Sequence, residues 1–94
     1  MAISRAERRA ERRERVVTTF GEDQAEIVLD LLELTELAWH DCYNEITPSD
    51  DIVDDLLVCS RGELAGLVRA ARLAVADWRD LKVWAQTERS NDPR

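Results

Sequence analysis

Apolar residues recur along most of the chain at the three- and four-residue spacing of amphipathic helices, and no stretch alternates with the two-residue period of a strand. This pattern predicts an all-α fold. Gly21 and the Thr47-Pro48 pair mark helix ends, because glycine favours the residue after a helix and a residue before proline avoids the α region. The predicted helices span residues 5–18, 22–43, 50–58 and 61–86.

The first predicted helix, 5–18, begins with a capping box and has few apolar positions. Glu7 follows Ser4 at a spacing of three, so each side chain can accept from the other's backbone N–H. Its early apolar residues are alanines, whereas Val17 and Phe20 come at its end. We therefore expect packing to hold only the second half of this helix.

The second predicted helix, 22–43, separates carboxylates from apolar residues. On a wheel of about 100° per residue, the carboxylates share one face and the apolar arc covers about half of the circle. Glu26, Asp30 and Glu33 belong to the acidic face. Leu37 lies within it, which makes this residue either a candidate contact or an ordinary exposed leucine.

Capping residues also mark the later helices. Ser49 is the predicted N-cap of helix 50–58, and Ser60 with Glu63 forms a capping box that is predicted to open helix 61–86. A line of small residues at spacing four in the last helix would allow a neighbour to approach closely: Gly62, Gly66, Ala70 and Ala74. The sequence predicts a small bundle with antiparallel pairing of the second and fourth helices.

The apolar surface exceeds what one protomer can cover. Leu73 and Trp84 form a second stripe on helix 61–86, apart from its main stripe, and the apolar arc of helix 22–43 is wider than one neighbour needs. Association through a two-fold axis would cover this surface. The sequence therefore predicts a homodimer.

Ninety-four residues are enough for one domain. Residues 1–20 form a basic N-terminal helix, 21–87 the core of the bundle, and 88–94 a polar tail that is expected to fray. No apolar run reaches the ~18 residues of a membrane span and no secretory signal opens the chain, so we expect a cytoplasmic protein that does not bind membranes. Cys42 and Cys59 are interpreted as buried thiols of a reducing compartment.

The formal net charge of −7 hides a strong segregation of charge along the chain. Residues 1–20 hold six arginines and three glutamates, and residues 21–60 hold twelve carboxylates with no lysine or arginine. Residues 61–94 hold seven basic and five acidic side chains. Such oppositely charged regions can attract each other or external partners.

No catalytic or metal-binding set is evident. The single histidine, His40, points about 160° away from Cys42 on the predicted helix, which excludes a local Cys/His pair. The acidic residues at 50–55 lack the alternating ligands and the glycine of a calcium loop. No glycine-rich phosphate loop is present. We predict a non-enzymatic protein without a metal or cofactor.

The arginine-rich helix is the one positive signal for nucleic acid, because its guanidinium groups could contact phosphates. These residues are Arg5, Arg8, Arg9, Arg12, Arg13 and Arg15. Glutamates interrupt them, however, and ion pairs within the helix or with an acidic protein surface explain them equally simply. A lesser alternative is that the acidic segment mimics the phosphates of DNA.

Two segments resemble small uncharacterised helical proteins of actinobacteria and their bacteriophages, including mycobacteriophages. They are residues 31–57, with Ala-Trp-His-Asp-Cys-Tyr-Asn-Glu-Ile-Thr-Pro-Ser-Asp-Asp, and residues 67–81, with Val-Arg-Ala-Ala-Arg-Leu-Ala-Val-Ala-Asp-Trp-Arg-Asp-Leu. The resemblance includes no motif of assigned chemistry. It implies a small phage-encoded regulatory protein that acts on a host protein in the host cytoplasm.

The leading hypothesis is therefore a helical protein-interaction module. Its candidate partner-binding residues are Leu37, Leu73, Trp84, Glu26, Asp30 and Glu33. The alternative is a nucleic-acid-binding protein that uses the arginine-rich helix.

Overall fold

The computed structural model describes residues 4–91. They form α1 (Arg5–Phe20), a 3₁₀ turn η1 (Glu22–Gln24), α2 (Ala25–Tyr43), α3 (Asp50–Ser60), α4 (Leu64–Ala76) and α5 (Trp78–Ser90). This part of the chain contains no strand, and the predicted all-α bundle is confirmed. None of its helices combines the length and the apolarity that a membrane span requires.

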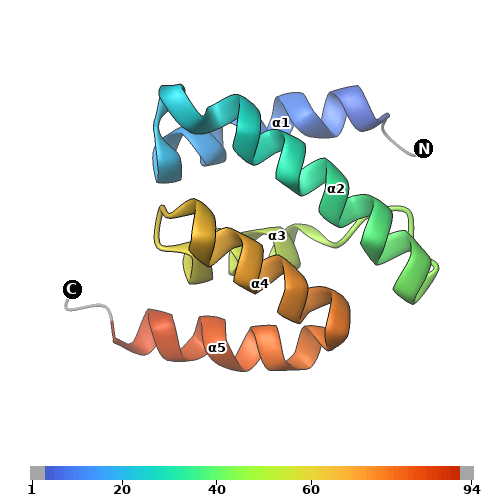
Figure 1. Cartoon of the computed structure of the whole chain (residues 1–94), viewed down its shortest axis with the longest axis vertical. Coiled ribbons are helices and arrows are strands. Elements are labelled where there is room, and N and C mark those ends of the chain that lie inside the picture. Colours follow the sequence, from blue (N-terminus) through green and yellow to red (C-terminus); the bar gives the residue numbers. More distant parts are fainter. Residues whose placement is uncertain (1–3, 92–94) are drawn as a thin grey trace.

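α1 and α2 lie side by side and run in opposite directions, as Figure 1 shows. The predicted capping box opens α1: Ser4 Oγ accepts from the N–H of Glu7 at 3.1 Å, and Glu7 Oε1 accepts from the N–H of Ser4 at 3.2 Å. The helix ends at Gly21, whose φ of +89° is a conformation that other residues rarely adopt. The chain thus reverses within a few residues.

α2 and α4 run in the same direction, so the predicted antiparallel pairing is wrong. Tyr43, at the C-terminal end of α2, donates its hydroxyl proton to the carbonyl oxygens of Ala74 at 2.7 Å and Val75 at 3.1 Å, near the C-terminal end of α4. The reason is α3, which is long enough to carry the chain back across the bundle before α4 begins (Figure 1).

The predicted helix 61–86 is interrupted, and α4 and α5 fold back on each other (Figure 1). Asp77 leaves the helical conformation, with φ −163° and ψ 104°, and its Oδ1 accepts from the N–H of Arg79 at 3.1 Å. Aspartate competes in this way with continued helix, because its carboxylate can satisfy a free N–H of the next helix.

The junction between α3 and α4 also differs from the prediction. Ser60 is the last residue of α3 and donates to the carbonyl oxygen of Leu57 at 2.6 Å, so it does not cap α4 with Glu63. The expectation of close approach holds at Gly66, where a Cβ atom would lie 2.5 Å from the carbonyl oxygen of Ser60. The small residue therefore lets the end of α3 lie directly against α4.

The core lies mainly between α2, α3, α4 and α5. Its largest fully buried apolar side chains are Leu29, Leu56, Leu67, Leu81, Val16, Val28 and Val53. Among the described residues of α1, only Val16 and Arg12 are buried, while Val17 and Phe20 pack partly against the core. Apolar burial thus holds the C-terminal half of α1, as predicted.

The predicted frayed tail, 88–94, begins too early. α5 continues through Ser90, because Glu88 and Arg89 make side-chain contacts that hold its last turn. Residues 92–94 of the predicted tail lie outside the described residues.

Replacing Tyr43 by Phe should lower the free energy of unfolding by about 1 kcal/mol, because the end of α4 and the first N–H of α5 lose a shared partner. Urea denaturation followed by circular dichroism measures the loss. Thr18→Ala is the control, since its hydroxyl bonds only to an exposed carbonyl oxygen of its own helix. Equal effects of the two substitutions would contradict a special role for the Tyr43 hydroxyl.

Candidate functional site

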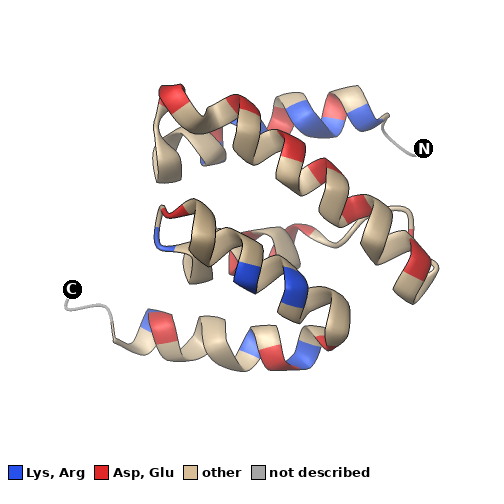
Figure 2. Cartoon of the chain, in the orientation of Figure 1, with Lys and Arg blue, Asp and Glu red and all other residues tan. Residues whose placement is uncertain are grey.

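Most of the charges that are segregated along the sequence form ion pairs with each other in the fold. Figure 2 shows the basic positions of α1 beside the acidic positions of α2. The surfaces that remain for a partner are therefore those with exposed apolar side chains and with charges that lack a partner in the described chain.

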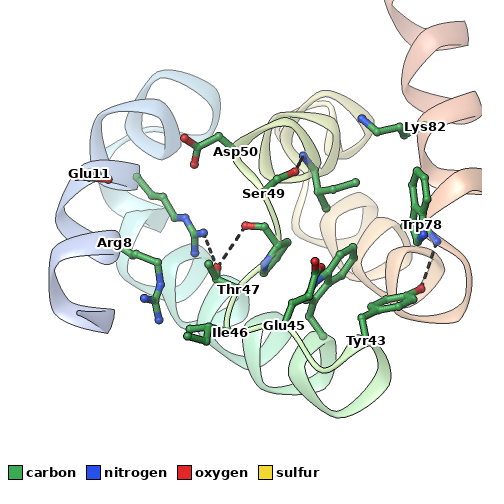
Figure 3. A pocket seen from close by; sticks show the side chains of 14 residues that line it. Arg8, Glu11, Tyr43, Glu45, Ile46, Thr47, Ser49, Asp50, Trp78 and Lys82 are labelled. Atoms are coloured by element: carbon green, nitrogen blue, oxygen red, sulfur yellow. Dashed lines mark hydrogen bonds between the residues drawn. The ribbon is translucent and has the colours of Figure 1, made fainter. Parts of the chain in front are cut away.

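A cleft of about 660 Å³ opens between α1 and α5, over the loop that joins α2 to α3. Its floor is apolar and nearly inaccessible to solvent, with Trp39 and Ile52 each 4% exposed. Ile46 and Trp78 also line the cleft, and their side chains remain 64% and 39% exposed. Figure 3 shows Trp78 beside Tyr43 on one side of the cleft, with α1 on the other. Three aromatic rings thus contribute to one concave surface.

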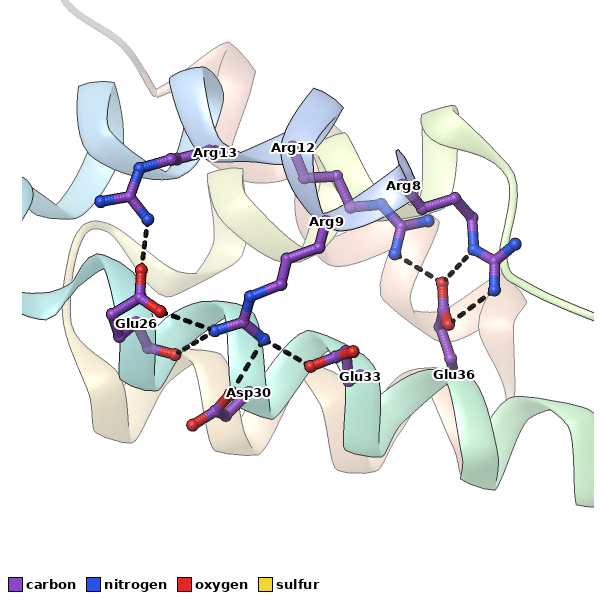
Figure 4. A network of polar contacts seen from close by, with 8 residues as sticks. All are labelled: Arg8, Arg9, Arg12, Arg13, Glu26, Asp30, Glu33 and Glu36. Carbon is purple, nitrogen blue, oxygen red and sulfur yellow. Dashed lines mark hydrogen bonds and ion pairs between the residues drawn. The ribbon is translucent and has the colours of Figure 1, made fainter. Parts of the chain in front are cut away.

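Glu36 fastens the α1 wall of this cleft. Its side chain is 3% exposed and accepts from Arg8 Nε at 2.7 Å and Arg12 Nη1 at 2.8 Å (Figure 4). Thr47 of the loop donates to the same carboxylate at 2.8 Å. Burial alone would raise the pKa of Glu36, but the hydrogen bonds from Arg8 and Thr47 and the charge of Arg12 hold it below its usual value. The carboxylate therefore ties α1, α2 and the loop together as an anion.

Asp55 of α3 has the same role at the α5 wall. Its side chain is 3% exposed, and it accepts from Lys82 Nζ and Arg89 Nη1, both at 2.8 Å. Cys59 is buried, as predicted, and burial together with the nearby Asp55 charge raises the pKa of its thiol to about 12. Cys42 is exposed, and the prediction that it is buried was wrong because it lies on the solvent side of α2.

Two carboxylates at the cleft lack partners. Glu11 of α1 and Asp50 at the start of α3 are exposed, and neither forms a hydrogen bond or ion pair with another of residues 4–91. The cations of the cleft are in contrast bound to buried carboxylates, through Glu36 and Asp55. The cleft therefore presents apolar and aromatic surface beside two carboxylates that pair with no cation of the described chain.

The acidic residues proposed for partner binding face α1 instead. Arg9 lies among Glu26, Asp30 and Glu33, at 3.0 Å from Glu26 Oε1 and 2.9 Å from Asp30 Oδ1 (Figure 4). Arg13 also pairs with Glu26, and hydrogen bonds from Arg13 and Arg9 lower the pKa of that carboxylate. These carboxylates serve the α1–α2 contact, although the side chains of Glu26 and Asp30 remain 67% and 66% exposed.

Most of the arginines that are candidates for nucleic-acid binding also form ion pairs within the fold. Four of them contact α2, Arg15 pairs with Asp54 of α3, and Arg5 is exposed. The four are Arg8, Arg9, Arg12 and Arg13. Binding to phosphates would require these ion pairs to break. The arrangement matches the alternative in which the basic helix lies on an acidic protein surface.

The three apolar candidates for partner binding do not lie on one surface. Leu37 is 49% exposed on α2, as expected of a contact residue or of an ordinary surface leucine. Leu73 and Trp84 are half-buried and lie on different helices, because the chain turns at Asp77. Trp84 packs against the core and donates from Nε1 to Glu88 at 3.2 Å. The predicted Leu73–Trp84 stripe is therefore not a continuous surface.

Sequence reasoning missed the cleft, because its residues come from α1, from α2 and the loop after it, from α3 and from α5. The helical pattern places Ile46 and Trp78 on buried stripes, whereas both are exposed in the structure. Each follows a helix break, at Asn44 and Asp77 respectively, and these breaks are the only local signal that could have suggested exposure.

None of the residues that line the cleft is a histidine or a cysteine. His40 is exposed, with Nδ1 at 3.1 Å from the carbonyl oxygen of Glu45. Within residues 4–91, no three histidine, cysteine, aspartate or glutamate side chains are arranged to hold a metal ion.

Comparison with models of known protein families, with curated proteins and with solved structures gave no significant match. Function is therefore inferred from the chain's own residues and contacts.

Replacing Arg12 by Gln should lower the free energy of unfolding by about 3 kcal/mol, because buried Glu36 loses one of its two cations. Arg13→Gln is the matched control in the same helix. Its ion pairs are exposed and screened by solvent, so the unfolding midpoint should change little. Urea denaturation measures both, and a control that is as damaging as Arg12→Gln would contradict the special role of the buried pair.

Lowering the pH should weaken the fold through Glu36. Because folding lowers its pKa, the ionised carboxylate contributes stability above the unfolded value, about 4.3, and this stability is lost as the pH falls through the folded value. The free energy of unfolding should therefore decrease below about pH 5. Glu36→Gln should be less stable at neutral pH and show a smaller decrease. Equal decreases for both proteins would contradict the assignment.

Proposed function

We propose that the protein is a non-enzymatic helical interaction module that binds a basic segment of a partner protein, with an apolar side chain of that segment in the cleft beside Trp78. The observation that carries this proposal is the exposed aromatic and apolar surface of the cleft over a buried floor. Aromatic residues in well-packed depressions supply much of the binding energy of protein interfaces.

The charges at the cleft favour a basic partner. Glu11 and Asp50 are unneutralised, whereas Lys82 and Arg8 are held by buried carboxylates. The chain's net charge of −7 would also steer a basic segment toward it. A ligand that fits would therefore place an aromatic or aliphatic side chain against the apolar surface of the cleft. An adjacent lysine or arginine would then lie near its unpaired carboxylates.

The resemblance to actinobacteriophage proteins suggests where the protein acts and what kind of partner it binds. A small phage-encoded regulator that acts in the host cytoplasm would bind a host protein, and a basic segment of such a protein would be the ligand of the cleft.

Selection from a library of random peptides displayed on phage should test this function. We expect enrichment of peptides with an aromatic or aliphatic residue next to lysine or arginine. Trp78→Ala should weaken binding of an enriched peptide by at least about tenfold, measured by fluorescence anisotropy, as for a hot-spot aromatic. Ile46→Lys should weaken it as well, because it removes an apolar contact and repels a basic peptide, and because Ile46 lies exposed in a loop, this change leaves the core intact.

Val83→Ala is the matched control, since Val83 is 64% exposed on the same helix as Trp78 but does not line the cleft. It should leave the affinity unchanged. Enrichment of acidic peptides, no enrichment at all, or equal losses in the control and cleft variants would overturn the proposal.

A further inference from the structure

A second exposed apolar surface lies between α2 and α4, away from the cleft. We define the α2–α4 face by apolar residues that line this groove, Leu31, Leu34, Ala38, Val68 and Val75, together with Ile27, which stands one turn before Leu31 on α2. Leu34 is 61% exposed, and Ile27 and Val68 are each 51% exposed. Contiguous apolar surface of this kind is typical of a protein interface, whereas isolated exposed leucines are ordinary.

Charge is distributed unequally across this face. On α4, Arg69 and Arg72 are exposed, and neither forms an ion pair with any residue of 4–91. On α2, Asp30 is 66% exposed despite its contact with Arg9, and Asp41 is exposed without a partner in the described chain. Figure 2 shows acidic positions of α2 and basic positions of α4 on the same side of the molecule.

The positions of these charges place them next to the apolar residues. Ile27, Leu34 and Asp41 follow each other at a spacing of seven, so they share one stripe of α2. On α4, Arg72 stands four residues after Val68 and lines the groove. The face therefore has an acidic edge, an apolar centre and a basic edge.

We propose that the α2–α4 face binds a second copy of the chain about a two-fold axis that runs parallel to α2 and α4. Because these helices lie side by side in the same direction, such an axis places α2 of one copy over α4 of the other. The acidic edge then meets the basic edge twice, and the apolar centres meet each other. An interface of this type is necessarily self-complementary.

The charges also exclude the other simple arrangement. A two-fold axis perpendicular to the helices would place α2 over α2 and α4 over α4, with acid against acid and base against base, which opposes association. The cleft beside Trp78 offers no comparable match to a copy of itself, because its unpaired charges are both acidic. Self-association is thus assigned to the α2–α4 face and is independent of the proposed function of the cleft.

Sedimentation equilibrium of the full chain tests the proposal. We expect a species of twice the 10.8 kDa chain mass at micromolar concentration. Arg72→Glu and Asp41→Arg should each weaken the dimer by about tenfold or more, since each places like charges opposite each other. The double variant should recover affinity, because the charge pair is restored in reverse. Arg5→Glu makes the same charge change on an exposed residue of α1 and should leave the dimer intact.

Leu34→Asp tests the apolar centre without disturbing the core, because this side chain is already largely in solvent. It should also dissociate the dimer. A monomer at all concentrations, or a dimer indifferent to Leu34→Asp and Arg72→Glu, would refute self-association through this face. A dimer that Leu34→Asp breaks but that the double variant fails to restore would refute the orientation. None of these results alters the peptide selection at the cleft.

Discussion

The N-terminal half of α1 is held to the bundle by one buried carboxylate, Glu36, and the donors that surround it. Removing a carboxylate from water is costly, and only close cations and hydrogen bonds offset that cost. Arg8, Arg12 and Thr47 supply them. Asp55 repeats the arrangement for α5. Since α1 and α5 form opposite walls of the cleft, these two buried anions hold side chains of both walls, although neither carboxylate lines the cleft itself.

The internal ion pairs also decide which surfaces remain for partners. Most of the basic charge of α1 is neutralised by α2, so the strongest electrostatic feature of the sequence is mainly a folding interaction. The charge that remains is small and local. Two acidic groups stand at the cleft, and an acidic and a basic edge flank the α2–α4 face. The net charge of the chain predicts neither surface, because both depend on which charges remain unpaired after folding.

Local signals predicted the local structure well. The caps at Ser4 and Ser49 and the fully helical fold follow from residues close in sequence. The break at Asp77 could not be predicted in this way, because apolar periodicity continues from Ala74 through Trp78 to Leu81. The direction of α4 relative to α2 depends on how α3 crosses the bundle, which is a tertiary property. The cleft was missed for the same reason, since α1, α5 and the stretch from the end of α2 to the start of α3 build it together.

The single non-helical residue between α4 and α5 makes the length of the chain at this point critical. Each residue added to or removed from a helix rotates the remainder of that helix by about 100° about its axis. A residue added or removed within the first turn of α5, directly after Asp77, would carry Leu81 out of the core and move Lys82 and Arg89 away from Asp55. In evolutionary terms, relatives of this chain should accept substitutions on the exposed side of α5 far more readily than any insertion or deletion in its first turn.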